Sequence, residues 1–67
     1  MEQNFGNEVE KAVTGIEFSS QDGTTIWREE FNDGSVGPWN TSVIETNNTS
    51  GVKALMKSLY KERGLEA

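Results

Sequence analysis

The dipeptide Asp22-Gly23, set between two runs of strand-forming residues, constrains the fold of this chain more than any other feature. Asp-Gly supplies the two positive φ angles of a type I′ turn, so it predicts a β-hairpin with a two-residue loop. A loop of that length fixes the register and places Gln21 opposite Thr24. The further pairs that follow are Ser20 with Thr25, Ser19 with Ile26, Phe18 with Trp27, Glu17 with Arg28, and Ile16 with Glu29.

This register assigns every side chain of the hairpin to one of two faces, because neighbouring residues of a strand point to opposite sides. The inner face is predicted to carry Ile16, Phe18, Trp27 and Glu29. The outer face is predicted to carry Ile26 and the oppositely charged pair Glu17 and Arg28. Glu29 is acceptable on an apolar face only at the margin of the sheet, where its carboxylate reaches water.

A second turn is predicted at Asp33-Gly34, again as a two-residue loop. It places Ile26 opposite Thr41 and Arg28 opposite Trp39. Pro38 cannot donate a hydrogen bond to a neighbouring strand, so the third strand, about 39–46, is expected at a sheet edge, unless a longer loop shifts its register. In the unshifted register Ile26, Trp39 and Val43 gather on the outer face, and Ile44 points inward.

Residues 49–64 carry the single apolar stripe of an amphipathic helix. Its members recur at i, i+3, i+4, i+7 and i+8, and they are Val52, Leu55, Met56, Leu59 and Tyr60. Thr49 or Ser50 is expected to cap the start, and Gly64 to end the helix in the left-handed conformation, with Leu65 against Tyr60. The stripe is expected to pack on the inner face of the sheet, over Ile16, Phe18, Trp27 and Phe31.

Residues 1–14 are predicted to form a short helix or arm. Asn7 and Glu10 have the spacing of a capping box. The apolar residues at helical spacing around them are Phe5, Val9, Ala12 and Val13. Thr14-Gly15 is expected to end this helix, because threonine is a weak helix former and glycine permits a C-cap.

Together these elements predict one α+β domain over residues 1–67: a short N-terminal helix, a three-stranded antiparallel meander over 15–46, and a C-terminal amphipathic helix packed on one face. A chain of 67 residues has a small core. It contains no cysteine or histidine, which removes disulfides and the common zinc sites. Oligomerisation is the usual remaining way to stabilise such a chain, so a homodimer or larger homo-oligomer is predicted.

Charge is unevenly distributed along the sequence. The formal net charge is −5; residues 1–50 hold nine acidic against two basic side chains, whereas residues 51–67 hold four basic against two acidic. An acidic total disfavours non-specific binding to nucleic acid, which depends on neutralising phosphates. The asymmetry permits head-to-tail self-association or an oppositely charged partner.

The residue types present disfavour an enzyme. General bases and activated nucleophiles are most often histidine or cysteine, and the chain has neither. Glu29 and Glu30 are neighbours on a strand and point to opposite faces, so they form no catalytic pair. No phosphate-binding loop or calcium-loop motif is present, and no cofactor or metal site is predicted.

Nothing in the sequence indicates a membrane protein. No signal peptide opens the chain, and no apolar run approaches the roughly 20 residues that span a bilayer. A cytoplasmic location is therefore expected.

The outer sheet face is the predicted contact surface. It comprises Ile26, Arg28, Trp39 and Val43, with Glu30 and Asp33 as an acidic rim. Arg28 is expected to stack on the indole of Trp39, and arginine and tryptophan are the residue types that most often dominate interfaces. The alternative is that the N-terminal helix, through Phe5, Val9 and Val13, covers this face. The favoured function is a non-enzymatic protein-binding module, such as a small acidic inhibitor of a host or competing enzyme from a phage or bacterial context.

A second function competes with this one. Lys53, Lys57 and Lys61 lie four residues apart and are predicted to form a basic ridge along the flank of the last helix. Together with Arg63 they would suit a small nucleic-acid-binding protein. A solvated helix face explains the same lysines without any ligand.

Overall fold

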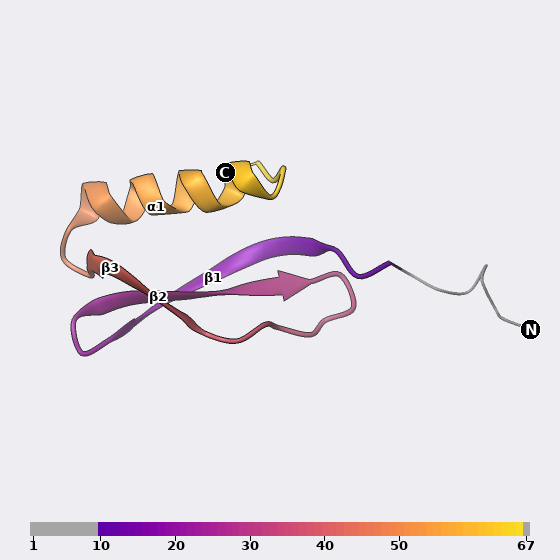
Figure 1. The fold of residues 1–67 in the computed structure, drawn as a ribbon, viewed down its shortest axis with the longest axis horizontal. Coiled ribbons are helices and arrows are strands. Elements are labelled where there is room, and N and C mark those ends of the chain that lie inside the picture. The colour runs from indigo at the N-terminus through magenta and orange to yellow at the C-terminus, as the bar shows by residue number, and fades with distance from the viewer. Residues whose placement is uncertain (1–9, 67) are drawn as a thin grey trace, which may run out of the picture.

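The computed structural model describes residues 10–66 as a three-stranded antiparallel sheet with one helix (Figure 1). The strands are β1 (Val13–Gln21), β2 (Thr24–Phe31) and β3 (Asn40–Glu45), in the order β1-β2-β3, and the helix is α1 (Thr49–Glu62). Helix α1 lies across one face of the sheet (Figure 1). The α+β class and the C-terminal helix of the sequence prediction are confirmed.

The first hairpin has the predicted register. Asp22 and Gly23 have φ angles of 53° and 80°, as a type I′ turn requires. The pairs run without interruption from Gln21 opposite Thr24 to Ile16 opposite Glu29. One Asp-Gly pair therefore specifies the two strands that form the centre of the molecule.

The predicted N-terminal helix is not found from residue 10 onward, where the described part of the chain begins. Residues 1–9, with Phe5, Asn7 and Val9, lie outside the described residues. Val13 and Thr14 belong to β1, so the prediction that a helix runs to Thr14 is wrong. The ladder continues past a bulge between Val13 and Gly15, so Val13 lies opposite Phe31.

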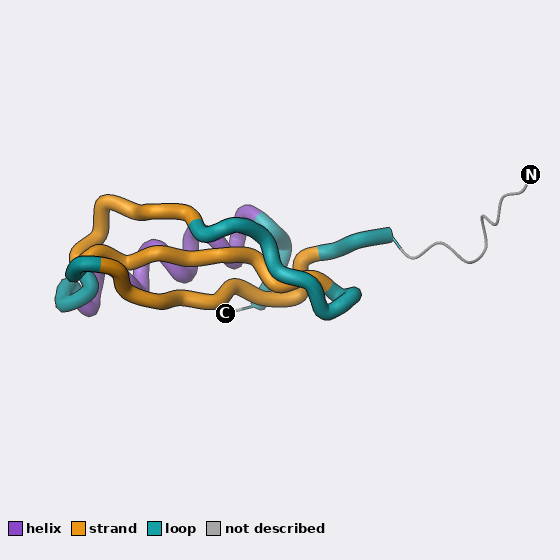
Figure 2. The backbone as a smooth tube through the Cα atoms, turned by 90° about the horizontal axis from the view of Figure 1, so that it is seen from below, coloured by secondary structure: helices purple, strands orange, loops and turns teal. Residues whose placement is uncertain are grey.

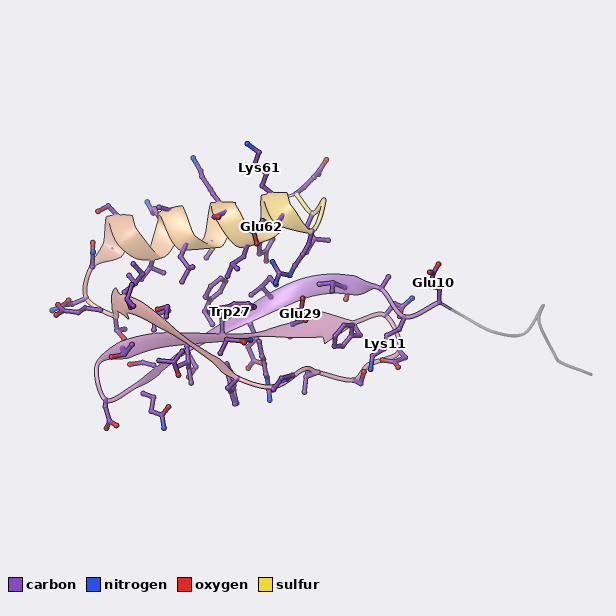
Figure 3. The ribbon with its side chains drawn as sticks, viewed as in Figure 1. Glu10, Lys11, Trp27, Glu29, Lys61 and Glu62 are labelled. Atoms are coloured by element: carbon purple, nitrogen blue, oxygen red, sulfur yellow. The ribbon has the colours of Figure 1, made fainter. Side chains whose placement is uncertain are left out.

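Asn32 holds the chain that leads into β1. Its backbone N–H donates to the Ala12 carbonyl at 2.9 Å, and its side-chain amide donates to the Glu10 carbonyl at 3.1 Å. Beside it the Lys11 ammonium lies 4.5 Å from the ring centre of Phe31 (Figure 3). Pairing to β2 satisfies the backbone here better than a helix could, because a helix ending at Thr14 would leave the edge of β2 open.

The second turn is longer than predicted. Phe31 N–H donates to the Ser35 carbonyl and Gly34 N–H to the Phe31 carbonyl, so the loop has three residues, Asn32 to Gly34. Gly34 has a φ of 87°, the left-handed conformation that ends this loop type. The prediction of a two-residue loop at Asp33-Gly34 is therefore wrong. The sequence did not distinguish the two loop lengths, because Gly34 supplies the positive φ angle that either loop requires.

The predicted pairing of β3 survives because a second irregularity cancels the first. Glu30 lies opposite Val36, one position out of the predicted register, and an extra residue before Asn40 restores it. Trp27 then lies opposite Asn40 and Ile26 opposite Thr41. Beyond Thr41 the strand bulges again.

Helix α1 is capped differently at its start and as predicted at its end. The Asn48 side chain, rather than Thr49 or Ser50, accepts the first hydrogen bond, from Gly51 N–H at 3.0 Å. Asn48 immediately precedes the helix, so its side chain can reach the backbone N–H of Gly51 in the first turn. At the other end Leu65 N–H donates to the Tyr60 carbonyl at 2.8 Å, with Gly64 at a φ of 72°, which is a Schellman motif.

The core between α1 and the sheet is small. We call the helix-covered side of the sheet the inner face and the opposite side the outer face. The buried apolar side chains of the described residues are Ile16, Ile26 and Leu59. Ile16 belongs to the inner face and Leu59 to the helix stripe that covers it, as predicted. Half-buried Phe18, Trp27 and Ile44 belong to the inner face, whereas Ile26 lies on the outer face, so the core beneath α1 is shallow.

Candidate functional site

The outer face carries no covering element within residues 10–66. In Figure 2 the strands stand in front and α1 lies wholly behind them. Exposure along β3 alternates: Asn40, Ser42 and Ile44 are half-buried, and the residues between them are exposed. The exposed set of β3 therefore faces away from the helix.

Three large apolar side chains are exposed in a line on this face. Trp39 is 42% exposed, Val36 45% and Val43 95%. Val36 shares the face of Glu30, which it opposes, and Val43 projects from the bulge in β3. We call Val36, Trp39 and Val43 the outer apolar row.

Arg28 and Glu17 fix the tryptophan of this row. The Arg28 guanidinium lies 4.4 Å from the ring centre of Trp39, and Arg28 Nε donates to Glu17 Oε1 at 2.7 Å. The predicted stacking of Arg28 on the indole is present. An exposed contact of this kind stabilises by about 0.5–1 kcal/mol, which favours this orientation of the indole before anything binds it.

Ile26 is not part of the exposed surface. It is only 8% exposed, although it lies on the outer face between Ser19 and Thr41. The expectation that Ile26 adds exposed apolar area to this face is therefore wrong. Ile26 lies on the central strand of the sheet, so it has neighbouring strands on both sides. We interpret Ile26 as a structural residue of the outer face that lies beneath the outer apolar row.

Apart from Glu17, which is paired with Arg28, the acidic residues of this side fall into two kinds. Glu30 and Glu45 are exposed, and within residues 10–66 neither makes an ion pair. We call Glu30 and Glu45 the carboxylate rim. Asp33 instead serves its own turn: it accepts hydrogen bonds from the hydroxyl and the backbone N–H of Ser35. Those bonds, the hydroxyl's first, lower the pKa of Asp33 below its ordinary value.

The basic residues of α1 separate in the same way. Lys53, Lys57 and Lys61 are exposed on the side of the helix turned away from the sheet, where Figure 3 shows Lys61. We call these three the lysine ridge. Arg63 does not join them, contrary to the prediction.

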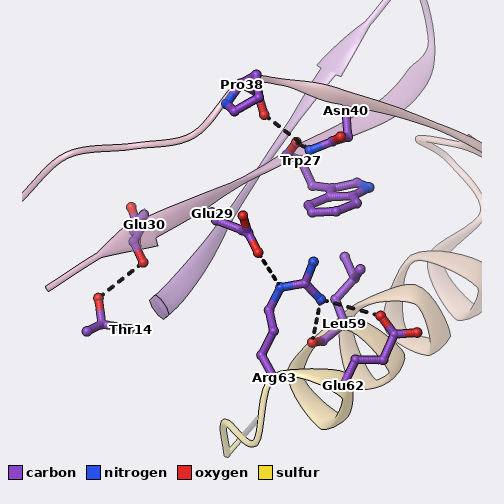
Figure 4. Close-up of polar contacts among 9 residues, drawn as sticks. All are labelled: Thr14, Trp27, Glu29, Glu30, Pro38, Asn40, Leu59, Glu62 and Arg63. Carbon is purple, nitrogen blue, oxygen red and sulfur yellow. Dashed lines mark hydrogen bonds and ion pairs between the residues drawn. The ribbon is translucent and has the colours of Figure 1, made fainter. Parts of the chain in front are cut away.

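Arg63 reaches the inner face instead (Figure 4). Its Nε donates to Glu29 Oε2 at 2.7 Å, its Nη1 donates to the Leu59 carbonyl at 3.0 Å, and its guanidinium lies 5.2 Å from the ring centre of Trp27. Packing explains the difference, because Glu29 on the helix-covered face needs a cation and Arg63 is on the turn above it. Glu29 thus lies on the inner face as predicted, with a partner the prediction lacked.

Sequence reasoning missed Val36, Glu45 and the role of Arg63. Val36 lies in the loop, and only the three-residue turn brings it opposite Glu30. Glu45 could have been placed on the outer face by alternation from Val43. The carboxylate of Glu29 on an apolar face was itself a signal that a cation had to lie across from it.

Within residues 10–66, the remaining features do not form a built chemical site. A hollow of about 470 Å³ lies between the turn of the first hairpin and the end of β3, with Asp22, Glu45 and Asn47 among its lining residues. Across residues 10–66, no group of three or more potential metal-binding Asp, Glu, His or Cys side chains comes together. Within the same residues, no helix has both the length and the apolar character to cross a membrane.

Comparison with models of known protein families, with curated proteins and with solved structures finds no match for this chain.

Proposed function

We propose that this protein is a non-enzymatic protein-binding module whose contact surface is the outer face of the sheet. The observation that carries the proposal is the outer apolar row, which lies beside a stacked Arg28 on a face that no described element covers. Apolar side chains exposed singly are normal on a protein surface, whereas several on one uncovered face favour an interaction site.

The composition of the surface supports the same function. Trp39 and Arg28 are the residue types most often found to dominate binding energy. The ion pair with Glu17 holds Arg28 in place, so the indole is presented in one orientation and loses little entropy on binding. Thr41, between Trp39 and Val43, adds a polar group to the same line.

The class of partner we favour is an enzyme with a basic, nucleic-acid-binding groove, which a small acidic protein would inhibit by occupying it. Electrostatic complementarity speeds such encounters and selects among partners. A phage or bacterial setting suits an inhibitor of this size. A homo-oligomer remains a prediction beside this one.

A variant of the outer apolar row tests the proposal. The full chain, its Trp39→Ala/Val43→Ser variant and a Lys57→Ala control are each immobilised, and proteins retained from bacterial extract are quantified. We expect at least one protein retained by wild type and control to be lost by the double variant, while circular dichroism shows all three chains folded. Equal retention of every protein by all three chains would exclude the outer face as a contact surface.

The lysine ridge supports nucleic-acid binding as a second function. Lys53, Lys57 and Lys61 point outward along one flank of α1, but without Arg63 they are three charges on an acidic molecule. If they contact phosphate, an electrophoretic shift must weaken steeply as salt rises. A chain that shifts DNA or RNA equally at low and high salt, or not at all, does not use the ridge in this way.

A further inference from the structure

The unpaired charge of the outer face and the distance between its two exposed carboxylates specify its partner further. This inference rests on the proposed function. We propose that the outer face binds a basic segment of another protein, one that presents apolar side chains between two cationic groups about 20 Å apart.

The sign follows from which charges on this face are already neutralised. Its cation, Arg28, is paired with Glu17 at 2.7 Å. Glu30 and Glu45 make no ion pair within residues 10–66. An approaching segment therefore meets the carboxylate rim as unpaired negative charge, and a basic segment gains attraction without displacing an existing pair.

The length follows from the register. Glu45 lies opposite Thr24, and Glu30 is six positions further along β2. At about 3.3 Å per residue the two ends of the rim are about 20 Å apart, with Trp39 and Val43 between them. A helix of about 13 residues has that length, as does a strand of about six.

A second copy of this chain fits the face poorly in either orientation. Two outer faces brought together would oppose one carboxylate rim to the other, and like charges repel. The exposed side of α1 offers the lysine ridge, but between those lysines it has only small residues, Ala54 and Ser58. Its large apolar side chains are turned toward the sheet, so it has nothing to cover Trp39.

Designed peptides provide the probe. One peptide forms a helix with leucines on one face and lysine pairs at its two ends, about 13 residues apart; its match carries glutamates in place of the lysines. Binding to the full chain labelled with ¹⁵N is followed through the Trp39 indole N–H and the Val43 amide. The Trp27 indole N–H, on the helix-covered face, serves as internal reference.

The variants separate the rim from the net charge. Glu30→Lys/Glu45→Lys reverses the rim, and Glu62→Lys/Glu66→Lys changes the net charge equally at exposed positions of α1 and the C-terminal end. We expect the lysine peptide to shift the Trp39 and Val43 signals in wild type. We expect reversal of the rim to raise the dissociation constant at least about tenfold, and the control to raise it less than about threefold.

Three results would overturn the inference: equal binding of the glutamate peptide, equal weakening by the two double variants, or no shift at Trp39 at millimolar lysine peptide. Each leaves the proposed function to its own test. If a protein is still lost from the Trp39→Ala/Val43→Ser bait, the face binds a partner that is not basic.

Discussion

The two faces of the sheet carry the same three residue types with the same two kinds of contact. On the inner face these are Arg63, Trp27 and Glu29; on the outer face they are Arg28, Trp39 and Glu17. Each arginine donates to its glutamate at 2.7 Å, and the guanidinium-to-indole distances are 5.2 and 4.4 Å. The inner set joins α1 to the sheet across 34 positions of sequence, whereas the outer set stays within the first strands and the loop.

The two sets differ because α1 covers the inner set, whereas no described element covers the outer set. The carboxylate of the inner set is 28% exposed and that of the outer set 41%. The inner set forms the contact between α1 and the sheet within one chain. The outer set is the same chemistry with its tryptophan still facing solvent, which is why we interpret it as half of an interface.

The largest effect is expected from removing the helix contact itself. Leu59→Ala truncates the most buried apolar side chain of α1 and should cost about 2–5 kcal/mol, which unfolds or nearly unfolds a domain with so small a core. Leu55→Ala, at a half-buried position, should cost less. Thermal melts with Val43→Ala as exposed control measure both, and a Leu59→Ala midpoint equal to that control would mean that α1 does not pack on the sheet.

Replacing the inner tryptophan should likewise destabilise the protein more than replacing the outer one. Trp27→Ala opens the space beneath α1 and should cost about 3 kcal/mol. Trp39→Ala should cost about 1 kcal/mol, because it loses the stack with Arg28 and partly uncovers Ile26. Urea titrations give both values, and equal losses would indicate that the outer face is closed in the free protein.

The two arginines give a smaller contrast. Arg63→Gln leaves Glu29 uncompensated on the covered face and should cost about 1–2 kcal/mol, between the values for exposed and buried pairs. Arg28→Gln should cost about 0.5 kcal/mol, and that loss should fade more as salt is raised. Stability of both variants at low and high ionic strength tests the ranking, which a larger loss for Arg28→Gln would reverse.

The smallest effect concerns pH. Hydrogen bonds from Ser35 lower the pKa of Asp33 in the folded chain, so its contribution is present above the unfolded pKa and is lost as pH falls through the folded pKa. Asp33→Ala should therefore destabilise the protein at neutral pH, and the difference from wild type should shrink in acid. A difference that stays constant down to strongly acidic pH would show that the carboxylate charge contributes nothing to the turn.

Local patterns predicted what depends on neighbouring residues in sequence. Asp22-Gly23 specified the register of β1 and β2, and Gly64 specified the end of α1, because each needs one backbone conformation that few residues adopt. The stacking of Arg28 on Trp39 followed from the same register. It was correct even though the loop before Trp39 was one residue longer than predicted.

Contacts between distant residues could not be predicted in this way. Arg63 and Glu29 are paired by the way α1 lies on the sheet, and helical periodicity does not specify which cation of the last turn points down. Ile26 was assigned to the surface by alternation, which gives the face of a side chain but not what its neighbours shield. The start of β1 was missed because Val9 to Val13 fit a helix locally, while Asn32 offers partners only in the folded chain.

The bulge in β3 also bears on which edge of the sheet could accept a further strand. Between Thr41 and Glu45 the strand has two more residues than β2 uses for the same stretch, and Ser42 turns its hydroxyl to the Thr25 carbonyl. An edge with such an interruption, preceded by Pro38, is a poor template for a further strand, so we expect strand addition along this side to be disfavoured. If copies exchange or add strands under stress, the nine-residue β1, whose ladder is regular from Gly15 onward, is where the addition should begin.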